Sequence, residues 1–439
     1  MSFSELHLKP SILKALEKKA YSDATPIQKE LIPVIFSGHD VLAGAQTGTG
    51  KTAAFALPIL QDLAGKFEEG KHYPKALILV PTRELAKQVH QSFVEYGEFL
   101  PLKSEVLYGG ANFSAQTNRL KNGVDIIIAT TGRLLEHIGK NHIDLKTIKF
   151  LVMDEADTIL DMGFLNEVSQ IFQHLPETRQ NILISATLSA PLKKLSREVL
   201  HKPKRIEVDN MGTAASLVKQ VVYPVEAEKK AELLSYLIGS RNYSMVMVFV
   251  RKRAEADMVA EELELSGLKT AVIHGEKSSG ERSRALSDFK EGKIRVLVAT
   301  DIAARGLDIP SLEVVFSYDI PHVTQDFIHR IGRTGRAGKA GLAITLISPS
   351  EMVALRDVER MLGRPLPKEN LEGYAPKVLG TQKGARKSDK KKSTDGAFGS
   401  KKKKSTTFSK TKKRKTTKRD GFKVYDENKS TKDKKKGRK

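Results

Sequence analysis

The strongest constraint on how this chain can fold lies in residues 45 to 52, which read AQTGTGKT. Their spacing is that of the pattern G-x-x-x-x-G-K-[ST], with Ala45 in the place of the first glycine. An apolar run precedes this segment, and a helix-compatible run, Ala53–Leu57, follows it. A strand, a glycine-rich turn and a helix start direct backbone N–H groups toward one point, which suits the phosphates of a nucleotide.

Each part of this segment has an expected role at those phosphates. Lys51 should reach the β- and γ-phosphates, and the Thr52 hydroxyl should ligate Mg²⁺. The remaining residues expected to surround the phosphates are Gln46, Thr47, Gly48, Thr49 and Gly50.

Composition excludes several classes of protein. The chain has 439 residues, of which 40% are hydrophobic, and it has no cysteine. This length is enough for two full cores and a tail. The absence of cysteine excludes a disulfide framework and thiolate chemistry. No apolar run is long enough to span a bilayer, and the first residues lack the pattern of a secretory signal. We therefore expect a cytoplasmic protein without membrane association, and a monomer.

The positive charge of the chain is concentrated at its end. Residues 381–439 contain 25 Lys and Arg against 6 Asp and Glu, a net charge of +19, which leaves +3 of the total +22 for residues 1–380. A segment rich in Lys, Ser and Thr has too little apolar surface to offset its ordering entropy. The sequence predicts a disordered basic tail that binds a polyanion, with a purely solubilising tail as the alternative.

Two successive series of short apolar runs predict an α/β fold with two tandem parallel-sheet domains. Runs rich in Val, Ile and Leu, separated by helix-length segments, are typical of parallel strands buried on both faces. A flexible linker is expected between the domains at 208–217. The first-half strands are expected at Val41–Ala43, Ala76–Val80, Ile126–Ala129, Phe150–Met153 and Ile182–Ile184. The second-half strands are expected at Val221–Val225, Met245–Val250, Thr270–Ile273, Val296–Ala299, Val314–Tyr318 and Ala343–Ile347.

Polar clusters follow directly after many of these apolar runs. The carboxyl ends of parallel strands form the ligand-binding edge of an open α/β sheet, so these clusters and the phosphate loop should share that edge. The clusters are Pro81–Glu84, Thr130–Arg133, Asp154–Asp157, Ser185–Thr187 and Thr300–Gly306.

Two of the charged segments suggest chemistry. Asp154 and Glu155 end a buried strand, where the first carboxylate can hold Mg²⁺ and the second can orient or deprotonate an attacking water. The alternative is that they cap a helix. Arg330, Arg333 and Arg336 recur at three-residue spacing, which predicts one helical face that presents cations to phosphate, as an arginine finger does. The alternative is a surface helix with salt bridges.

This ordered series of motifs resembles that of the DEAD-box RNA helicases of superfamily 2, most closely the bacterial members. Asp154-Glu155-Ala156-Asp157 spells the family name, and the resemblance covers nearly all of residues 1–350. It implies two RecA-like domains. The implied boundaries are 1–30 for an adenine-recognition region, 31–207 for the ATP-binding domain, 208–217 for the linker, 218–370 for the C-terminal helicase domain and 371–439 for the tail.

The resemblance also implies roles for individual residues. The implied contacts with ATP, besides the phosphate loop, are Tyr21, Thr25, Gln28 and Asp308, with Phe3 as an upstream aromatic. The implied RNA-binding residues are Pro81, Thr82, Arg83, Gly109, Gly110, Thr130, Gly132, Arg133, Arg282, Thr300, Asp301, Arg305 and Gly306, with Phe249 in support. The residues implied to couple the two sites are Asp157, Ser185, Thr187, His329 and Arg330. The implied catalytic residues are Lys51, Asp154, Glu155, Arg333 and Arg336.

Few residues depart from the family pattern. Ala20 and Ala24 replace the usual Gly and Pro of the adenine motif, Thr131 replaces a Pro, and Ser279 replaces a Gln.

The sequence therefore predicts an ATP-dependent RNA helicase that uses Mg²⁺ and separates short duplexes when its two domains close. RNA is the expected partner. Ribosomal or mRNA-decay assemblies are candidate further partners. Three alternatives are a DNA-directed helicase, a non-catalytic RNA-binding or annealing protein, and a ribonucleoprotein component that uses ATP as a locking ligand.

Overall fold

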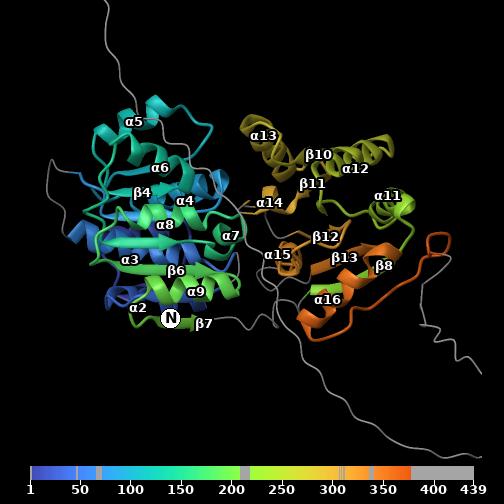
Figure 1. Cartoon of the computed structure of the whole chain (residues 1–439), viewed down its shortest axis with the longest axis horizontal. Coiled ribbons are helices and arrows are strands. Elements are labelled where there is room, and N and C mark those ends of the chain that lie inside the picture. The colour runs from blue at the N-terminus through green and yellow to red at the C-terminus, as the bar shows by residue number, and fades with distance from the viewer. Residues whose placement is uncertain are drawn as a thin grey trace, which may run out of the picture. The chain divides into compact units, whose positions relative to one another are not determined.

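The computed structural model describes residues 2–45, 48–65, 72–207, 218–305, 307, 309, 312–335 and 341–376. Within these residues the chain forms two open sheets that belong to the same compact unit (Figure 1). The predicted linker, Gln46, Thr47, Gly306, Asp308, Arg336 and residues 377–439 of the predicted tail lie outside the described residues.

The first sheet has seven strands in the order β3-β4-β2-β5-β6-β1-β7, and every pairing is parallel. A parallel order requires a crossover after each strand, which the intervening helices supply. Its strands are β1 (Val41–Gly44), β2 (Ala76–Leu79), β3 (Ser104–Leu107), β4 (Ile126–Ala129), β5 (Phe150–Met153), β6 (Gln180–Ser185) and β7 (Lys204–Glu207).

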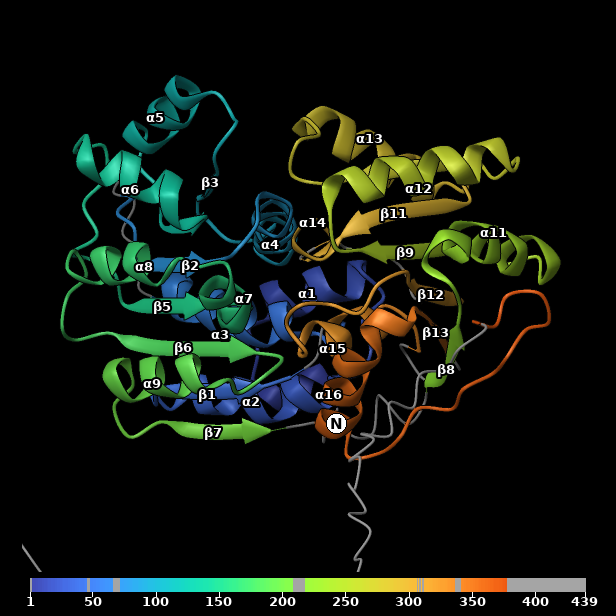
Figure 2. The same ribbon diagram turned by 45° about the vertical axis from the view of Figure 1, so that its right-hand side comes forward.

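Helices cover both faces of this sheet (Figures 1 and 2). Successive strand residues alternate between faces, so Ile78 packs with one cluster and Leu77 and Leu79 with the other. The first cluster includes side chains of α1 (Pro10–Lys18), α2 (Pro26–Phe36), α3 (Lys51–Gly65) and α4 (Arg83–Tyr96). The second includes side chains of α5 (Phe113–Lys121), α6 (Thr131–Gly139), α7 (Ala156–Asp161), α8 (Leu165–Phe172) and α9 (Ala190–Val199). A 3₁₀ turn, η1 (Phe3–Leu6), precedes α1.

The second sheet has six parallel strands in the order β10-β11-β9-β12-β13-β8. Its strands are β8 (Val218–Pro224), β9 (Val246–Val250), β10 (Thr270–Ile273), β11 (Val296–Thr300), β12 (Val314–Ser317) and β13 (Gly341–Ile347). Its helices are η2 (Ala227–Lys229), α11 (Lys230–Ser240), α12 (Arg253–Leu265), α13 (Ser279–Lys290), α14 (Asp301–Ala304), α15 (Asp326–Ile331), η3 (Pro349–Glu351) and α16 (Met352–Leu362). Two separate apolar clusters again lie on the two faces.

The predicted fold class is confirmed, and each expected strand is present. Sequence analysis missed two strands, β3 and β7, which are the two edge strands of the first sheet. An edge strand needs less apolar surface, and β7 accordingly exposes Lys204, Arg205 and Glu207. Among the described residues, no helix combines the length and the apolar composition needed to cross a bilayer. The exact domain boundaries remain predictions.

Candidate active site and nucleic-acid interface

The strand order of the first sheet brings three of the predicted clusters together. Strands β5, β6 and β1 are neighbours, so the residues that follow β5 and β6 lie beside the phosphate loop that follows β1. Gly44 is in register with Ser185, and the Ala45 N–H donates to the Ser185 carbonyl at 2.9 Å. The parallel topology alone therefore assembles this part of the site.

The phosphate loop has the backbone conformation that its glycines permit. Gly48 and Gly50 have φ angles of 84° and 89°. A Cβ on Gly50 would lie 2.4 Å from Gln28 Nε2, so this position excludes any side chain. The helix α3 begins at Lys51, whose buried ammonium group donates to the Ala45 carbonyl at 3.1 Å. The predicted strand, turn and helix start are all present.

The predicted adenine motif is attached to this loop. Gln28 is buried, and its Nε2 donates to the Gly50 carbonyl at 3.0 Å while its Oε1 accepts from the Thr25 N–H at 2.9 Å. Tyr21 remains 42% exposed, as a ring available to a ligand must be. Ala20, beside it, has a φ of 55°, a left-handed conformation that explains why a glycine suits this position.

The two carboxylates after β5 are buried at the same edge. Glu155 has φ 50° and ψ 49°, a strained conformation for a residue other than glycine. Burial raises the pKa of both Asp154 and Glu155, and the Lys51 charge partly offsets that effect. Residues with strained backbones and perturbed carboxylates are typical of functional sites.

The donor set at this edge fits Mg²⁺. Thr52 and Asp154 line the same cavity and offer the hard oxygen ligands that Mg²⁺ prefers. In the described part of the chain no group of three or more acidic or histidine side chains could hold a metal by itself.

A single cavity of about 610 Å³ unites these residues, a volume in the range of small-molecule sites. Its lining includes Leu307 and Arg333, which follow strands of the second sheet. The lining residues from the first sheet and the segment before it that sequence analysis predicted are Phe3, Tyr21, Thr25, Gln28, Gly48, Gly50, Lys51, Thr52, Asp154 and Glu155.

The arrangement of the arginines corrects one prediction. The helix α15 ends at Ile331, so Arg330 and Arg333 do not share one helical face as expected. The glycine at 332 caps the helix, and a turn then carries Arg333 to the cavity. The spacing of three residues suggested a helix, but Gly332 favours termination.

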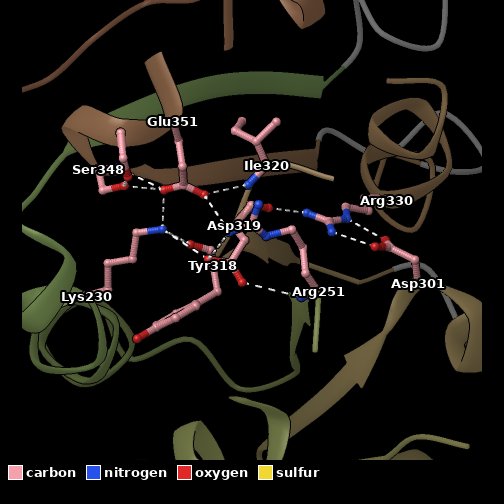
Figure 3. Close-up of polar contacts among 10 residues, drawn as sticks. Lys230, Arg251, Asp301, Tyr318, Asp319, Ile320, Arg330, Ser348 and Glu351 are labelled. Carbon is pink, nitrogen blue, oxygen red and sulfur yellow. Dashed lines mark hydrogen bonds and ion pairs between the residues drawn. The ribbon is translucent and has the colours of Figure 1, made fainter. Parts of the chain in front are cut away.

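Arg330 does not line the cavity and instead points toward Asp301 and Asp319 of the second domain (Figure 3). Its Nε and Nη2 donate to the two carboxylate oxygens of Asp301 at 2.5 and 2.7 Å, and its Nη1 donates to the Asp319 carbonyl. The guanidinium also lies over the Phe249 ring. Asp319 in turn contacts Lys230, so Arg330 belongs to a buried charge network.

Of the five predicted coupling residues, all except Arg330 contact one another. The Thr187 N–H and hydroxyl both donate to Asp157 Oδ2 at 2.8 Å, and the Ser185 hydroxyl donates to the Thr187 carbonyl at 2.6 Å. His329 Nε2 of the second domain lies 4.0 Å from Asp157 Oδ2. Asp157 therefore joins β5, β6 and α15.

The predicted RNA-binding residues of the first domain follow β2, β3 and β4, which are neighbours at the other end of the sheet. Thr82 caps α4 by accepting from the Leu85 N–H at 3.3 Å. The Arg83 guanidinium lies on Gly110, where an added Cβ would be 2.5 Å from Nη1. The Thr130 N–H donates to the Leu107 carbonyl at 2.9 Å, and Gly132 faces open space. Pro81 and Gly109 border the same residues in the chain.

The predicted RNA-binding residues of the second domain follow its neighbouring strands β10 and β11. Arg282 Nη2 lies 3.1 Å from Glu84 Oε1 of the first domain. Arg305 forms an ion pair with Asp326 and lies 3.6 Å from Asp161. Thr300 is the residue before α14, and Asp301 pairs with Arg330 as described.

The sequence did not single out several further lining residues of the cavity: Ser22, Asp23, Ala53, Leu85, Gln88, Ser92, Tyr96 and Leu307. Leu85, Gln88, Ser92 and Tyr96 lie on α4, and their spacing of three and four residues would have indicated a shared face. No motif singled out that face, because its residue types are common in any helix.

Comparison with known proteins agrees with this geometry. Residues 25–195 match the family described as DEAD/DEAH box helicase, and residues 229–338 match the helicase conserved C-terminal domain. The chain is 38% identical to the DEAD-box ATP-dependent RNA helicase CshA of Bacillus subtilis over 83% of its length and 73% of that protein. It is 37% identical to the ATP-dependent RNA helicase DeaD of Mycobacterium tuberculosis over 88% of its length and 68% of that protein.

Two solved structures share the fold. S. cerevisiae Dbp5 bound to RNA and ADP BeF3 is 28% identical with a TM-score of 0.75, over 84% of this chain and 95% of that one. Mss116p bound to ssRNA and AMP-PNP is 28% identical with a TM-score of 0.76, over 84% of this chain and 78% of that one. From its ordered motifs, its cavity and these relatives, the chain belongs to the DEAD-box family of ATP-dependent RNA helicases.

Proposed function

We propose that this enzyme locally separates short RNA duplexes, or remodels RNA–protein complexes, by coupling RNA-stimulated ATP hydrolysis to closure of its two domains. The observation that carries this proposal is the composition of the cavity. Lys51 and Glu155 from the first domain and Arg333 from the second line one space. A nucleotide there would contact both domains, so its hydrolysis would change how they are held together.

The residues of the cavity have separate tasks in hydrolysis. Tyr21 stacks on adenine and Gln28 binds its edge, while Lys51 binds the β- and γ-phosphates. Glu155 accepts the proton of the attacking water, and its raised pKa brings it closer to the operating pH. Arg333, with Arg336, stabilises the charge that develops on the transferred phosphoryl group. Mg²⁺, held by Thr52 and Asp154, would neutralise phosphate charge.

RNA would be bound through its backbone by the residues that follow β2, β3 and β4 in one domain and β10 and β11 in the other. Contacts with phosphates and 2′-hydroxyls carry little base information, so binding should be nearly independent of sequence. The solved relatives Dbp5 and Mss116p are each bound to RNA and a nucleotide analogue, which supports a ternary complex of this kind. The Asp157 cluster, which reaches His329, would couple the two ligands.

The basic tail would add general affinity for RNA. With a net charge of +19 in residues 381–439, it would release counterions on binding and make affinity fall with salt. Truncation after Gly380 should therefore keep RNA-stimulated ATP hydrolysis, raise the RNA concentration required, and flatten the dependence on salt. An unchanged salt dependence would assign the tail to solubility alone.

The deciding experiment compares nucleic acids as activators. Purified full-length protein should hydrolyse ATP slowly alone, much faster with single-stranded RNA, and little faster with DNA of the same sequence. It should also displace the short strand of an RNA duplex only when ATP is present. Equal stimulation by DNA would favour the DNA-directed helicase, and RNA binding without stimulated turnover would favour the non-catalytic alternatives.

A further inference from the structure

A buried glutamine lies directly beneath the Gly109–Gly110 turn of the first domain. Gln116 of α5 is fully buried, and its Nε2 donates to the Tyr108 carbonyl at 3.3 Å and to the Val106 carbonyl at 3.5 Å. These carbonyls belong to β3 and the residue that precedes the turn. The side-chain amide of Gln116 therefore fixes the strand end from which the turn departs.

The other side of the turn is fixed through the same glutamine. Arg133 Nη1 donates to Gln116 Oε1 at 2.8 Å and to the Ala111 carbonyl, directly after the turn, at 3.2 Å. Arg133 is itself nearly buried, and its Nε lies 3.0 Å from Glu136 Oε2. Gln116 and Arg133 thus bind the backbone on both sides of the two glycines.

Two histidines extend this arrangement behind Gln116. His137 Nε2 lies 3.4 Å from Gln116 Oε1, and His137 Nδ1 lies 3.3 Å from His142 Nδ1. An amide oxygen only accepts, so Nε2 of His137 carries the proton and Nδ1 must accept from His142 Nδ1–H. The Thr117 hydroxyl donates to the Phe113 carbonyl. Its oxygen lies 3.2 Å from His142 Nδ1 and can therefore accept from the same N–H. A single set of proton positions satisfies the whole chain of contacts.

The surroundings of His137 keep it in the neutral form that this assignment requires. Its ring is stacked on Phe113 with centroids 4.3 Å apart and planes within 6°. Burial lowers the pKa of His137 to about 4, and the nearby His142, Arg133 and Lys140 act in the same direction. At neutral pH, His137 therefore donates to Gln116 and does not compete with Arg133 as a second buried cation.

We propose that Gln116, oriented by His137, is a positioning residue that holds the Gly109–Gly110 turn in the shape that binds the RNA backbone. This rests on the proposed function, in which that turn contacts RNA. Gly110 has a φ of 83° and lies against Arg83, so movement of the turn would also displace Arg83. Loss of the amide should weaken RNA binding while the ATP cavity, built at the other end of the sheet, keeps its geometry.

The same domain offers a matched control. Gln180, at the start of β6, is also nearly buried and also donates from Nε2 to two backbone carbonyls, those of Ile35 and His39, at 3.1 and 2.6 Å. It binds residues at the amino end of the sheet, away from the predicted RNA edge. Gln116→Met and Gln180→Met therefore each remove two hydrogen bonds to backbone carbonyls, at opposite edges of the same domain, and only Gln116→Met also removes the acceptor of Arg133 and His137.

The test is the ATPase of both full-length variants, titrated separately with single-stranded RNA and with ATP. Gln116→Met should raise the RNA concentration for half-maximal stimulation by about 10-fold, because it removes the buried hydrogen bonds that Gln116 makes next to the turn. Its turnover at saturating RNA and its KM for ATP should stay within a factor of about 2 of wild type, and Gln180→Met should leave all three values unchanged within that factor. Thermal unfolding of both variants reports whether they are destabilised alike.

A second variant tests the positioning role of Gln116 without altering the glutamine itself. His137→Phe keeps a ring on Phe113 but removes the hydrogen bond to Gln116, and should raise the RNA requirement by about 3-fold. Equal RNA requirements for Gln116→Met and Gln180→Met, or a change in KM for ATP alone, would overturn the positioning role. Wild-type turnover that ignores RNA would instead refute the proposed function itself.

Discussion

The two halves of the carboxyl edge of the first sheet are built in opposite ways. Behind strands β5, β6 and β1, carboxylates such as Asp154 and Glu155 are buried, and burial raises the pKa of both. Behind strands β3, β4 and β2, the buried polar groups Gln116 and Arg133 are bonded to the protein's own backbone. The first half thus contains buried carboxylates whose charge a bound ligand can compensate. In the second half, buried side chains fix the conformation of the backbone. Substitutions in the first should change chemistry, and substitutions in the second should change RNA affinity.

The largest effect should follow from removing the cation of the nucleotide half. Lys51→Ala should abolish ATP binding and lower turnover by about 10³-fold or more, since its ammonium group is the buried cation of the phosphate loop. Nucleotide binding and RNA-stimulated ATP hydrolysis measure this directly. Lys18→Ala, which removes an exposed lysine paired with Glu98, is the control and should match wild type. Turnover near wild type in Lys51→Ala would remove the phosphate-loop assignment.

Two arginines of the second domain extend the contrast. Arg333 lines the cavity and makes a hydrogen bond to the Leu307 carbonyl, whereas Arg330 is paired with the Asp301 carboxylate. Arg333→Ala should lower RNA-stimulated turnover by about 10³-fold and destabilise the protein by only about 1 kcal/mol, the effect of one lost hydrogen bond. Arg330→Ala should instead destabilise the protein by about 3 kcal/mol, because it leaves Asp301 without its partner. Denaturant unfolding and ATP hydrolysis separate the two effects. Equal loss of stability in both variants would show that Arg333 contributes as much to folding as Arg330 does.

Acidification should affect the contributions of His137 and Asp154 to stability with opposite sign. His137 has a pKa of about 4, below its ordinary value of 6.5, so the unfolded chain binds more protons between these pH values. Its contribution to the free energy of unfolding should therefore fall by about 3 kcal/mol as pH drops through that window. The raised pKa of Asp154 acts in the other direction, because its native form takes up the proton first. Urea unfolding of wild type and His137→Phe between pH 7 and 4 should show a flatter pH dependence in the variant, and parallel curves would contradict it.

The smallest effect concerns the adenine motif. Ala20 has a φ of 55°, which costs a residue with a Cβ about 1 kcal/mol. Ala20→Gly should stabilise the protein by about 0.5 to 1 kcal/mol, with KM for ATP changed by less than about 2-fold. Thermal unfolding checks this, with Ala260→Gly in the interior of α12 as a control that should destabilise the protein. A destabilised Ala20→Gly would show that the strain is absent.

The sequence predicted most of the strands and the main residues of the nucleotide site because buried parallel strands and the phosphate loop leave strong local patterns. It missed β3 and β7, whose polar residues reflect their place at the sheet edges. It placed Arg330 and Arg333 on one helix because spacing alone does not reveal that Gly332 ends α15. Gln116 left no signal at all, since its importance comes from carbonyls and an arginine that only the fold brings to it.

The central claim is that ATP and RNA together bring Arg333 onto the nucleotide held by Lys51 and Glu155. Because the chain has no cysteine, spin labels can be attached at Glu198→Cys in α9 and Glu264→Cys in α12, both exposed, in the Glu155→Gln background that should retain ATP. Double electron–electron resonance then measures the distance between the two labels, one on each domain. If ATP and RNA together close the two domains, one narrow distance distribution should appear only when both are present, and a broad one with either alone. The same distribution under all conditions would contradict it.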